Sequence, residues 1–215
     1  MSENYELVIG SKNLSSWSLR PWLVLKYFGI PFSEVLIDLR APGRHLEILK
    51  HSPAGKVPVL KHGDLVVWDS LAIIEYIADT HSGKAVWPRE ADARAVARSV
   101  SAEMHSGFAP LREEFPMHFV DIREGVTPSE KAHADMQRIV DLWRDCRARF
   151  GAGGEFLFGA FSGADAMFAP VASRFNTYRI DLAQFGDDGT AARYRDHMMG
   201  IEEMRVWAED SRKEN

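Results

Sequence analysis

The sequence contains very little cysteine, because Cys146 is the single thiol among its 215 residues. One cysteine cannot form an internal disulfide, and the chain has no cysteine pair at the spacing of a redox motif or a zinc site. A dithiol redox protein needs a second cysteine to resolve its disulfide, so that class is excluded. The low cysteine content favours a reducing cytoplasm as the location of the protein.

The sequence also lacks long apolar runs and a charge excess of one sign. No stretch approaches the roughly 18 apolar residues of a membrane span, and residues 1–4 are polar and acidic rather than basic and then apolar. We therefore expect neither membrane insertion nor export. The 26 basic and 31 acidic residues occur in both halves of the chain, so we expect no nucleic-acid partner.

What remains has the proportions of an ordinary globular protein. Hydrophobic residues make up 46% of the chain and charged residues 27%, which is enough apolar side chain for a core. The eight histidines include no pair at the H-E-x-x-H spacing of a metalloprotease helix. We predict no metal. The length suits one large domain or two small ones.

The first eighty residues have the pattern of a small α/β domain with a parallel first strand pair and a hairpin closed at Gly63. The expected elements are a strand at residues 5–10, a helix at 15–29, a strand at 32–38, a short helix at 44–51, hairpin strands at 57–60 and 65–68, and a helix at 70–80.

After this region β-branched runs disappear and amphipathic helical patterns take over. We therefore divide the chain into a first domain at residues 1–82, a linker at 83–91 and an all-helical bundle domain at 92–215. Two apolar stripes define the bundle, namely Val96, Val100, Met104, Phe108, Leu111 and Phe115, and Met136, Ile139, Val140, Trp143, Cys146 and Phe150. The position of Cys146 on a stripe indicates packing rather than catalysis.

A cluster of hydroxyl residues lies where the first strand meets the first helix, in the segment Ser15-Ser16-Trp17-Ser18-Leu19-Arg20-Pro21. Serines here can cap the helix, and Pro21 requires the helix to begin near Trp17 or Ser18. The same hydroxyls, together with the positive end of the helix, also suit an anion such as a thiolate.

Two further polar features each allow a structural and a binding interpretation. Pro58 can simply begin a strand, whereas a cis Val57-Pro58 bond would turn the backbone of Val57 toward a peptide ligand. Asp69 and Ser70 can cap the third helix, but a hydroxyl and first-turn amides also suit a carboxylate, and Asp69 suits an ammonium group.

A fourth feature opens an apolar helix in the bundle domain. Ser162-Gly163-Ala164-Asp165 has the outline of a capping box, with Asp165 where glutamate or glutamine is usual. We interpret it as structural.

Taken together and in this order, the four features resemble the soluble glutathione transferase superfamily over essentially the whole chain. The nearest pattern looks like the zeta, or maleylacetoacetate isomerase-like, class, whose serine-serine-cysteine-serine-x-arginine opening is similar to Ser15-Ser16-Trp17-Ser18-Leu19-Arg20. The segment from Ser70 to Tyr76 is also similar to that class, as is Ala164-Asp165 followed by Pro170.

The resemblance implies a thioredoxin-like first domain that binds glutathione as co-substrate, and a cleft toward the bundle for a second substrate. Ser15 matches the serine whose hydroxyl meets the glutathione sulfur, and we expect it to be catalytic. The expected glutathione-binding residues are Ser15, Ser16, Trp17, Lys56, Val57, Pro58, Asp69 and Ser70. The expected cleft residues are Trp17, Met104, His105, Phe108 and Met117. Arg40, Arg44 and His45 could neutralise the glycyl carboxylate.

The sequence departs from the zeta pattern at three positions. Trp17 replaces the cysteine, Ala109 replaces a glutamine, and Thr177 stands where an arginine for the substrate carboxylate is expected, with Arg174 and Arg179 nearby. These differences weaken the isomerase assignment without touching the glutathione site.

We therefore predict a glutathione transferase that activates the glutathione thiol for attack on a small, largely apolar electrophile. The alternatives are a glutathione-dependent cis-trans isomerase and a non-enzymatic binding module with the same fold. The resemblance also implies a homodimer, with residues 69–80 and 92–119 at its interface.

Overall fold

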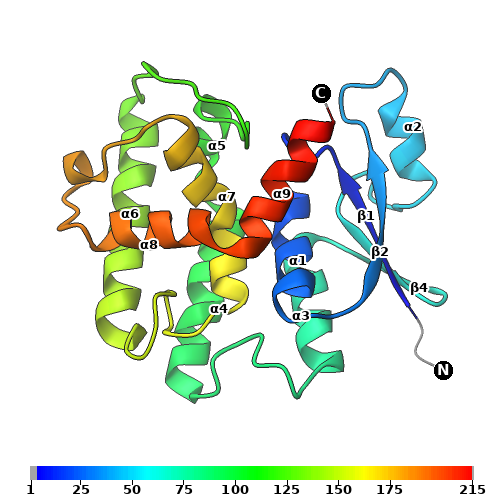
Figure 1. Ribbon diagram of the computed structural model, residues 1–215, viewed down its shortest axis with the longest axis horizontal. Helices are drawn as coiled ribbons and strands as arrows, with labels where there is room; N and C mark the ends of the chain where they lie inside the picture. The colour runs from blue at the N-terminus through cyan, green and yellow to red at the C-terminus, as the bar shows by residue number, and fades with distance from the viewer. Residues whose placement is uncertain (1–3, 215) are drawn as a thin grey trace.

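The computed structural model describes residues 4–214, and the first third of them forms a four-stranded sheet with three helices (Figure 1). Residues 1–3, on which the expectation about the N-terminus rests, lie outside the described residues. The elements are β1 (Tyr5–Gly10), α1 (Ser16–Tyr27), β2 (Phe32–Ile37), α2 (Arg44–Leu49), β3 (Val59–His62), β4 (Leu65–Trp68) and α3 (Ser70–Thr80).

The sheet has the strand order β2-β1-β3-β4. β1 runs parallel to β2, as the β-α-β pattern predicted, and antiparallel to β3, which in turn is antiparallel to β4. The face opposite α1 and α3 carries a small core made by Val8, Ile37, Ile48 and Val59, through which α2 packs on the sheet.

The β3–β4 hairpin differs from the prediction, because β3 begins two residues later and includes Lys61 and His62. The turn therefore shrinks to Gly63 and Asp64, and Gly63 adopts the positive φ of 58° that short hairpin turns favour. Both misassigned side chains have partners from elsewhere: Lys61 Nζ lies 2.9 Å from Glu6 Oε1, and His62 Nδ1 lies 2.7 Å from the Tyr76 hydroxyl. Local periodicity cannot reveal such partners.

The remaining regular elements in residues 4–214 are helices, which confirms the predicted fold class of a thioredoxin-like domain followed by a helical domain. These helices are α4 (Ala91–Ser106), α5 (Ala109–Glu114), α6 (Glu130–Phe150), α7 (Gly163–Thr177), a 3₁₀ turn at Leu182–Phe185, α8 (Thr190–Gly200) and α9 (Glu202–Lys213). Within residues 4–214 we find no helix with the length and apolar character needed to cross a bilayer.

The first apolar stripe of the bundle does not lie on one continuous helix. α4 ends at Ser106, and Phe108 has a positive φ of 59° before α5 begins. Pro110 explains the break, because it has no N–H to donate to the Ser106 carbonyl one turn earlier.

Helix α1 is buried on every side between the sheet and the bundle (Figure 1). It packs on α3, α7 and α9 as well as on the sheet. It starts at Ser16, slightly earlier than Pro21 led us to expect. The position of its first turn is therefore set by both halves of the chain.

The C-terminal helix also holds the segment that leads into α1. The buried Lys12 ammonium lies 2.8 Å from Glu34 on β2 and 2.8 Å from Asp210 on α9. The backbone N–H of Lys12 donates to the Glu214 carboxylate, and its carbonyl accepts from Trp207 Nε1 at 2.9 Å. These bonds join the two ends of the chain near the start of α1.

The capping box predicted at the start of α7 is present. Asp165 is fully buried, and its carboxylate accepts hydrogen bonds from the amides of Leu157 and Ser162 at 3.0 and 2.8 Å. The Ser162 and Tyr194 hydroxyls donate to it at 3.0 and 3.1 Å. One carboxylate thus satisfies four donors from three segments.

Asp165→Ala should destabilise the protein by about 3 kcal/mol, because several buried donors would lose their acceptor. Urea unfolding followed by tryptophan fluorescence and circular dichroism measures this loss. Asp181→Ala is the control, since Asp181 caps the 3₁₀ turn at the surface through the Ala183 amide. It should cost about 1 kcal/mol or less. Equal losses in the two variants would show that the Asp165 network contributes nothing beyond an ordinary cap.

Candidate functional site

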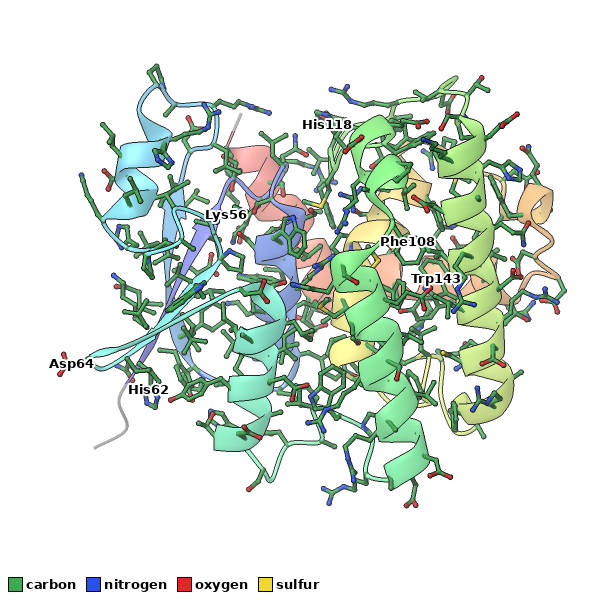
Figure 2. The ribbon with its side chains drawn as sticks, turned by 180° about the vertical axis from the view of Figure 1, so that it is seen from behind. Lys56, His62, Asp64, Phe108, His118 and Trp143 are labelled. Atoms are coloured by element: carbon green, nitrogen blue, oxygen red, sulfur yellow. The ribbon has the colours of Figure 1, made fainter. Side chains whose placement is uncertain are left out.

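A cavity of about 600 Å³ opens where the starts of α1 and α3 meet the loop before β3. Fifteen residues line it, and they include all eight residues predicted to bind glutathione. The others are Leu14, Leu39, Ile48, Ala54, Gly55, Trp68 and His105. His105 on α4 is the one lining residue from the helical part. In the view of Figure 2, Lys56 stands on the sheet side of α1 and Phe108 on the bundle side.

Ser15 caps α1 and takes part in a chain of hydrogen bonds. Its Oγ accepts a long bond from the Ser18 amide at 3.4 Å and donates to Ser18 Oγ at 2.7 Å. Ser18 is fully buried, and its Oγ accepts the Gly10 amide at 3.1 Å. The chain links the end of β1 to the Ser15 hydroxyl, so it fixes that hydroxyl at the start of the helix.

The first turn of α1 also offers uncommitted polar groups. The Ser16 amide donates to the Leu14 carbonyl at 3.1 Å, whereas the Ser16 hydroxyl and the Trp17 amide make no hydrogen bond within residues 4–214. A free N–H at a helix N-terminus and two nearby hydroxyls form a suitable site for an anion.

The loop before β3 brings a backbone edge and a cation to the cavity. The Val57–Pro58 peptide bond is cis, and neither the N–H nor the carbonyl of Val57 is hydrogen-bonded within the described part of the chain. Lys56 is exposed and forms no ion pair among these residues. Beside this loop, the His45 ring lies close to Gly55, where a Cβ would approach it to 3.1 Å.

Asp69 and Ser70 occupy the start of α3 and both line the cavity, but Asp69 also caps the helix. Asp69 has a φ of 76°, and its Oδ1 accepts from the amides of Leu71 and Ala72 at 2.9 and 3.3 Å. Two first-turn amides are therefore already occupied. Its Oδ2 lies 3.2 Å from His105 Nε2. The buried Ser70 remains as the hydroxyl at this end of the cavity.

Arg20 lies behind Ser70 and was not predicted beyond its place in the motif. It is 1% exposed, its Nη1 lies 3.5 Å from Ser70 Oγ, and its guanidinium stacks 4.3 Å from the Trp17 ring. Burial, followed by the charges of Arg174 and Arg112, lowers its pKa to about 9. The available signal was a cation followed by an apolar segment of the helix, where periodicity alone predicts core.

Two of the five predicted cleft residues, Trp17 and His105, line the cavity. Their rings meet edge to face with centroids 5.2 Å apart. Met104, Phe108 and Met117 do not line it, because they are buried in the main hydrophobic core. Met104 and Phe108 belong to the first apolar stripe of the bundle and Met117 follows it, and all three pack inside this core.

The residues near the expected substrate-carboxylate position are committed to the backbone. The buried Arg174 donates from Nε to the Phe115 carbonyl at 2.8 Å and from Nη1 to the Pro170 carbonyl at 3.2 Å. Thr177 Oγ1 donates to the His118 carbonyl at 2.9 Å. These bonds connect α7 to the segment after α5.

Neither a metal cluster nor a reactive thiol accompanies the cavity. Residues 4–214 contain no group of three or more histidine, cysteine, aspartate or glutamate side chains placed to hold a metal ion. Cys146 is buried on α6, and burial raises the pKa of its thiol to about 12, so it is protonated at neutral pH.

Comparison with known proteins identifies the N-terminal part of the chain. Residues 14–80 match the family model described as glutathione S-transferase, N-terminal domain, which confirms the resemblance seen in the sequence. Glutathione S-transferase 1 of Dianthus caryophyllus is 28% identical over 86% of this chain and 84% of its own. The maleylacetoacetate isomerase of Rattus norvegicus is 26% identical over 79% of this chain and 77% of its own.

The complete fold also has counterparts among solved structures. A glutathione transferase homologue from Burkholderia, solved with bound glutathione, aligns with a TM-score of 0.72 over 99% of this chain and 100% of its own. Its sequence identity is 21%, so this likeness concerns the fold.

Ser18→Ala should destabilise the protein by about 2 kcal/mol, because the buried Gly10 amide would lose its acceptor. The matched control is Ser101→Ala, a buried helical serine whose hydroxyl donates to the Ala97 carbonyl of its own helix at 2.7 Å. That carbonyl keeps its helical partner, so the control should cost about 1 kcal/mol or less. Urea unfolding measures the free energy of unfolding of both variants and of the wild type. A loss in Ser18→Ala no larger than in the control would contradict the assigned role.

Proposed function

We propose that this chain, which belongs to the glutathione transferase superfamily, binds glutathione in the 600 Å³ cavity and transfers its sulfur to a small, largely apolar electrophile. The observation that carries the proposal is the meeting of Ser15, Val57 and Ser70 around one cavity, although they belong to three separate segments. The cavity volume lies within the range of small-molecule sites. The bound glutathione of the Burkholderia homologue supports the choice of ligand.

The polar groups around the cavity suit the chemically different parts of the tripeptide. Ser70 offers a hydroxyl to the γ-glutamyl carboxylate, and Asp69 offers a carboxylate to its ammonium group. The free N–H and carbonyl of Val57 can pair with the cysteinyl backbone in the manner of an added strand. Lys56 and His45 lie where they could neutralise the glycyl carboxylate.

The sulfur would then lie at the start of α1, where it has to become an anion. A free thiol has a pKa of about 8.5, so only a few per cent is thiolate at neutral pH. A hydrogen bond from Ser15, the free Trp17 amide and the positive end of α1 all stabilise the charged form and lower the thiol pKa. Ser15 donates this bond and is not itself a nucleophile.

Ser18 allows Ser15 to turn toward the sulfur without losing its buried partner. In the ligand-free protein the Ser15 proton points to Ser18 Oγ. When that proton turns to the sulfur, the Ser18 hydroxyl can donate to Ser15 Oγ, while Ser18 still accepts from Gly10. Hydrogen bonds in such a chain strengthen one another.

The electrophile would approach from the bundle side, over Trp17 and His105. These two rings provide an apolar wall with one titratable group beside the sulfur position. Attack forms a carbon–sulfur bond and expels a leaving group or adds across a double bond. The protein contributes orientation and electrostatics to this step.

A cis-trans isomerase is the second candidate, supported by the name of the rat relative. That assignment calls for a cation that can meet the substrate carboxylate. Arg174 is buried and donates to two carbonyls, and Arg179 lies 3.8 Å from Glu124, so neither offers a free guanidinium to the cavity. The geometry therefore supports the transferase better.

The domain division at residues 1–82 and 92–215 is part of the proposal. The end of α3 at Thr80 supports the first boundary, and α4 begins at Ala91, one residue before the proposed second domain. The cytoplasmic location stays a prediction.

Ser15→Ala should lower turnover of a model electrophile at least tenfold, because the thiolate loses its hydroxyl donor, while glutathione binding persists through Val57 and Ser70. Stopped-flow kinetics measures turnover, and the ultraviolet absorbance of the thiolate, followed as a function of pH, gives the pKa of the bound thiol. That pKa should lie below about 8.5 in the wild type and rise in the variant.

Ser16→Ala is the matched control, since Ser16 is the adjacent serine in the cavity wall. Ser16→Ala should lower turnover less than Ser15→Ala does. A larger loss in Ser16→Ala would assign the catalytic role to Ser16. If glutathione binds but no member of an electrophile panel reacts, the chain is a non-enzymatic binding module.

We also propose a homodimer with α3 and α4 at the interface. Sedimentation equilibrium at micromolar concentration should give about twice the 24.2 kDa chain mass. A single-chain mass throughout the concentration range would reject the dimer and leave the glutathione site unaffected.

A further inference from the structure

The loop between β1 and α1 takes its backbone hydrogen bonds at Lys12 and Asn13 from the helical part of the chain. The Glu214 carboxylate accepts the Lys12 N–H at 2.8 and 2.9 Å, and the Asn13 N–H also bonds to it. The Lys12 carbonyl accepts from Trp207 Nε1 at 2.9 Å. The Asn13 carbonyl accepts the Phe119 N–H at 3.0 Å. Buried backbone groups need such partners, so the helical part completes this loop.

The Lys12 side chain makes the same connection through its charge. Lys12 is 4% exposed, and its ammonium lies 2.8 Å from both Glu34 on β2 and Asp210 on α9. The ammonium also lies 5.1 Å from the Trp22 ring on α1 and 5.3 Å from the Trp207 ring on α9. These two rings meet edge to face, where α9 runs beside α1 (Figure 1). Lys12 thus fastens β2, α1 and α9 at one point.

The loop that Lys12 anchors leads directly to Ser15. The Ser11 carbonyl accepts the N–H groups of Leu14 and Ser15 at 3.0 and 2.8 Å, so residues 11–15 form one tight turn. A shift of Lys12 is therefore passed on to the Ser15 hydroxyl. Hydrogen bonds weaken steeply with distance and angle, so the position of this hydroxyl decides how strongly it can bond to a thiolate.

We propose that Lys12 is a positioning residue for thiol activation, through which α9 holds the Ser15 hydroxyl at the glutathione sulfur. Lys12 is not among the fifteen described residues that line the cavity, so it acts through the loop and not on the ligand. This inference rests on the proposed function, because it requires the sulfur at the start of α1. It makes catalysis in the first domain depend on the Asp210, Glu214 and Trp207 contacts of α9.

The competing explanation is that these contacts only stabilise the fold. In that case variants of the loop anchor unfold more easily, but the folded enzyme keeps its kcat and its bound-thiol pKa. The positioning role predicts a lower kcat and a raised pKa in the folded enzyme. The KM for glutathione should change little, because Val57 and Ser70 belong to other segments.

Glu214→Ala is the first test, made in the full chain. Glu214 follows the last residue of α9, so the helix should remain while the loop N–H groups lose their acceptor. With a model electrophile, kcat should fall about fivefold and the KM for glutathione should change less than twofold. Glu214→Gln keeps an acceptor oxygen and should have a kcat between those of the wild type and Glu214→Ala.

The direction of the pKa change separates position from charge. Removal of the Glu214 carboxylate makes the surroundings more positive, which by itself would stabilise the thiolate and lower the pKa of the bound thiol. A displaced Ser15 would raise that pKa instead. The ultraviolet absorbance of the thiolate, followed as a function of pH, measures the change, and we expect a rise.

Lys12→Met tests the side-chain anchor, with Lys61→Met as the control. Lys12→Met should lower kcat about tenfold, and the double variant with Glu214→Ala should lose little more, because both act through one loop. Lys61 is also a paired lysine, 2.9 Å from Glu6 on the sheet, so its loss should leave kcat and the thiol pKa unchanged. If Lys12→Met fails to fold, the Glu214 variants still decide the question.

An unchanged kcat in Glu214→Ala, or a bound-thiol pKa that stays equal or falls, would overturn the role of the loop anchor. Equal losses of kcat in Lys61→Met and Lys12→Met would also overturn it. Both results leave the glutathione site standing. A wild-type chain that does not bind glutathione would instead refute the proposed function, so wild-type titration distinguishes the two failures.

Discussion

The burial of α1 on all sides is the constraint on which the rest of the structure depends. The sheet and α3 pack on it from the first domain, and α7 and α9 pack on it from the bundle. Nine of its twelve residues are buried. A helix enclosed in this way cannot shift without disturbing both halves of the chain. Its first turn can therefore hold polar groups at the wall of a cavity with little freedom to move.

The cavity shows how the two halves divide their contributions. The first domain provides fourteen of the fifteen lining residues, and the bundle provides His105. The bundle nevertheless fixes the position of the site, because Asp210, Glu214 and Trp207 hold Lys12 three residues before Ser15. Groups that line the cavity and groups that position them thus come from opposite ends of the chain.

Buried charge is balanced differently in different parts of the molecule. Arg20 is buried beside two further arginines, and Ser70 is its one acceptor among the described residues. Lys12, in contrast, lies between two carboxylates, and Asp165 accepts four hydrogen bonds. The cavity wall at Ser70 is therefore backed by a cation that forms no ion pair within residues 4–214.

The sequence by itself determined the order of elements in the first eighty residues and the residues at several of their ends. Alternation and helical spacing are local properties, so they placed α3 at residues 70–80 and the capping box at Ser162 and Asp165 correctly. The serine cluster, Val57-Pro58 and Asp69-Ser70 were found because polar residues at helix starts and prolines before strands are local signals as well. Their gathering around one cavity came from the resemblance and not from any spacing in the chain.

Only the tertiary structure decided which side chains face the cavity and which face the core. Met104 and Phe108 have the same helical spacing as a cleft wall would have, yet both are buried in the core, whereas His105 on α4 lies toward Asp69. Lys61 and His62 joined β3 because partners distant in the chain hold them. The tertiary structure also buries Arg20 and leaves its Nε without a hydrogen-bond partner in residues 4–214. Packing between distant segments sets burial and charge balance, and a one-dimensional pattern carries no information about it.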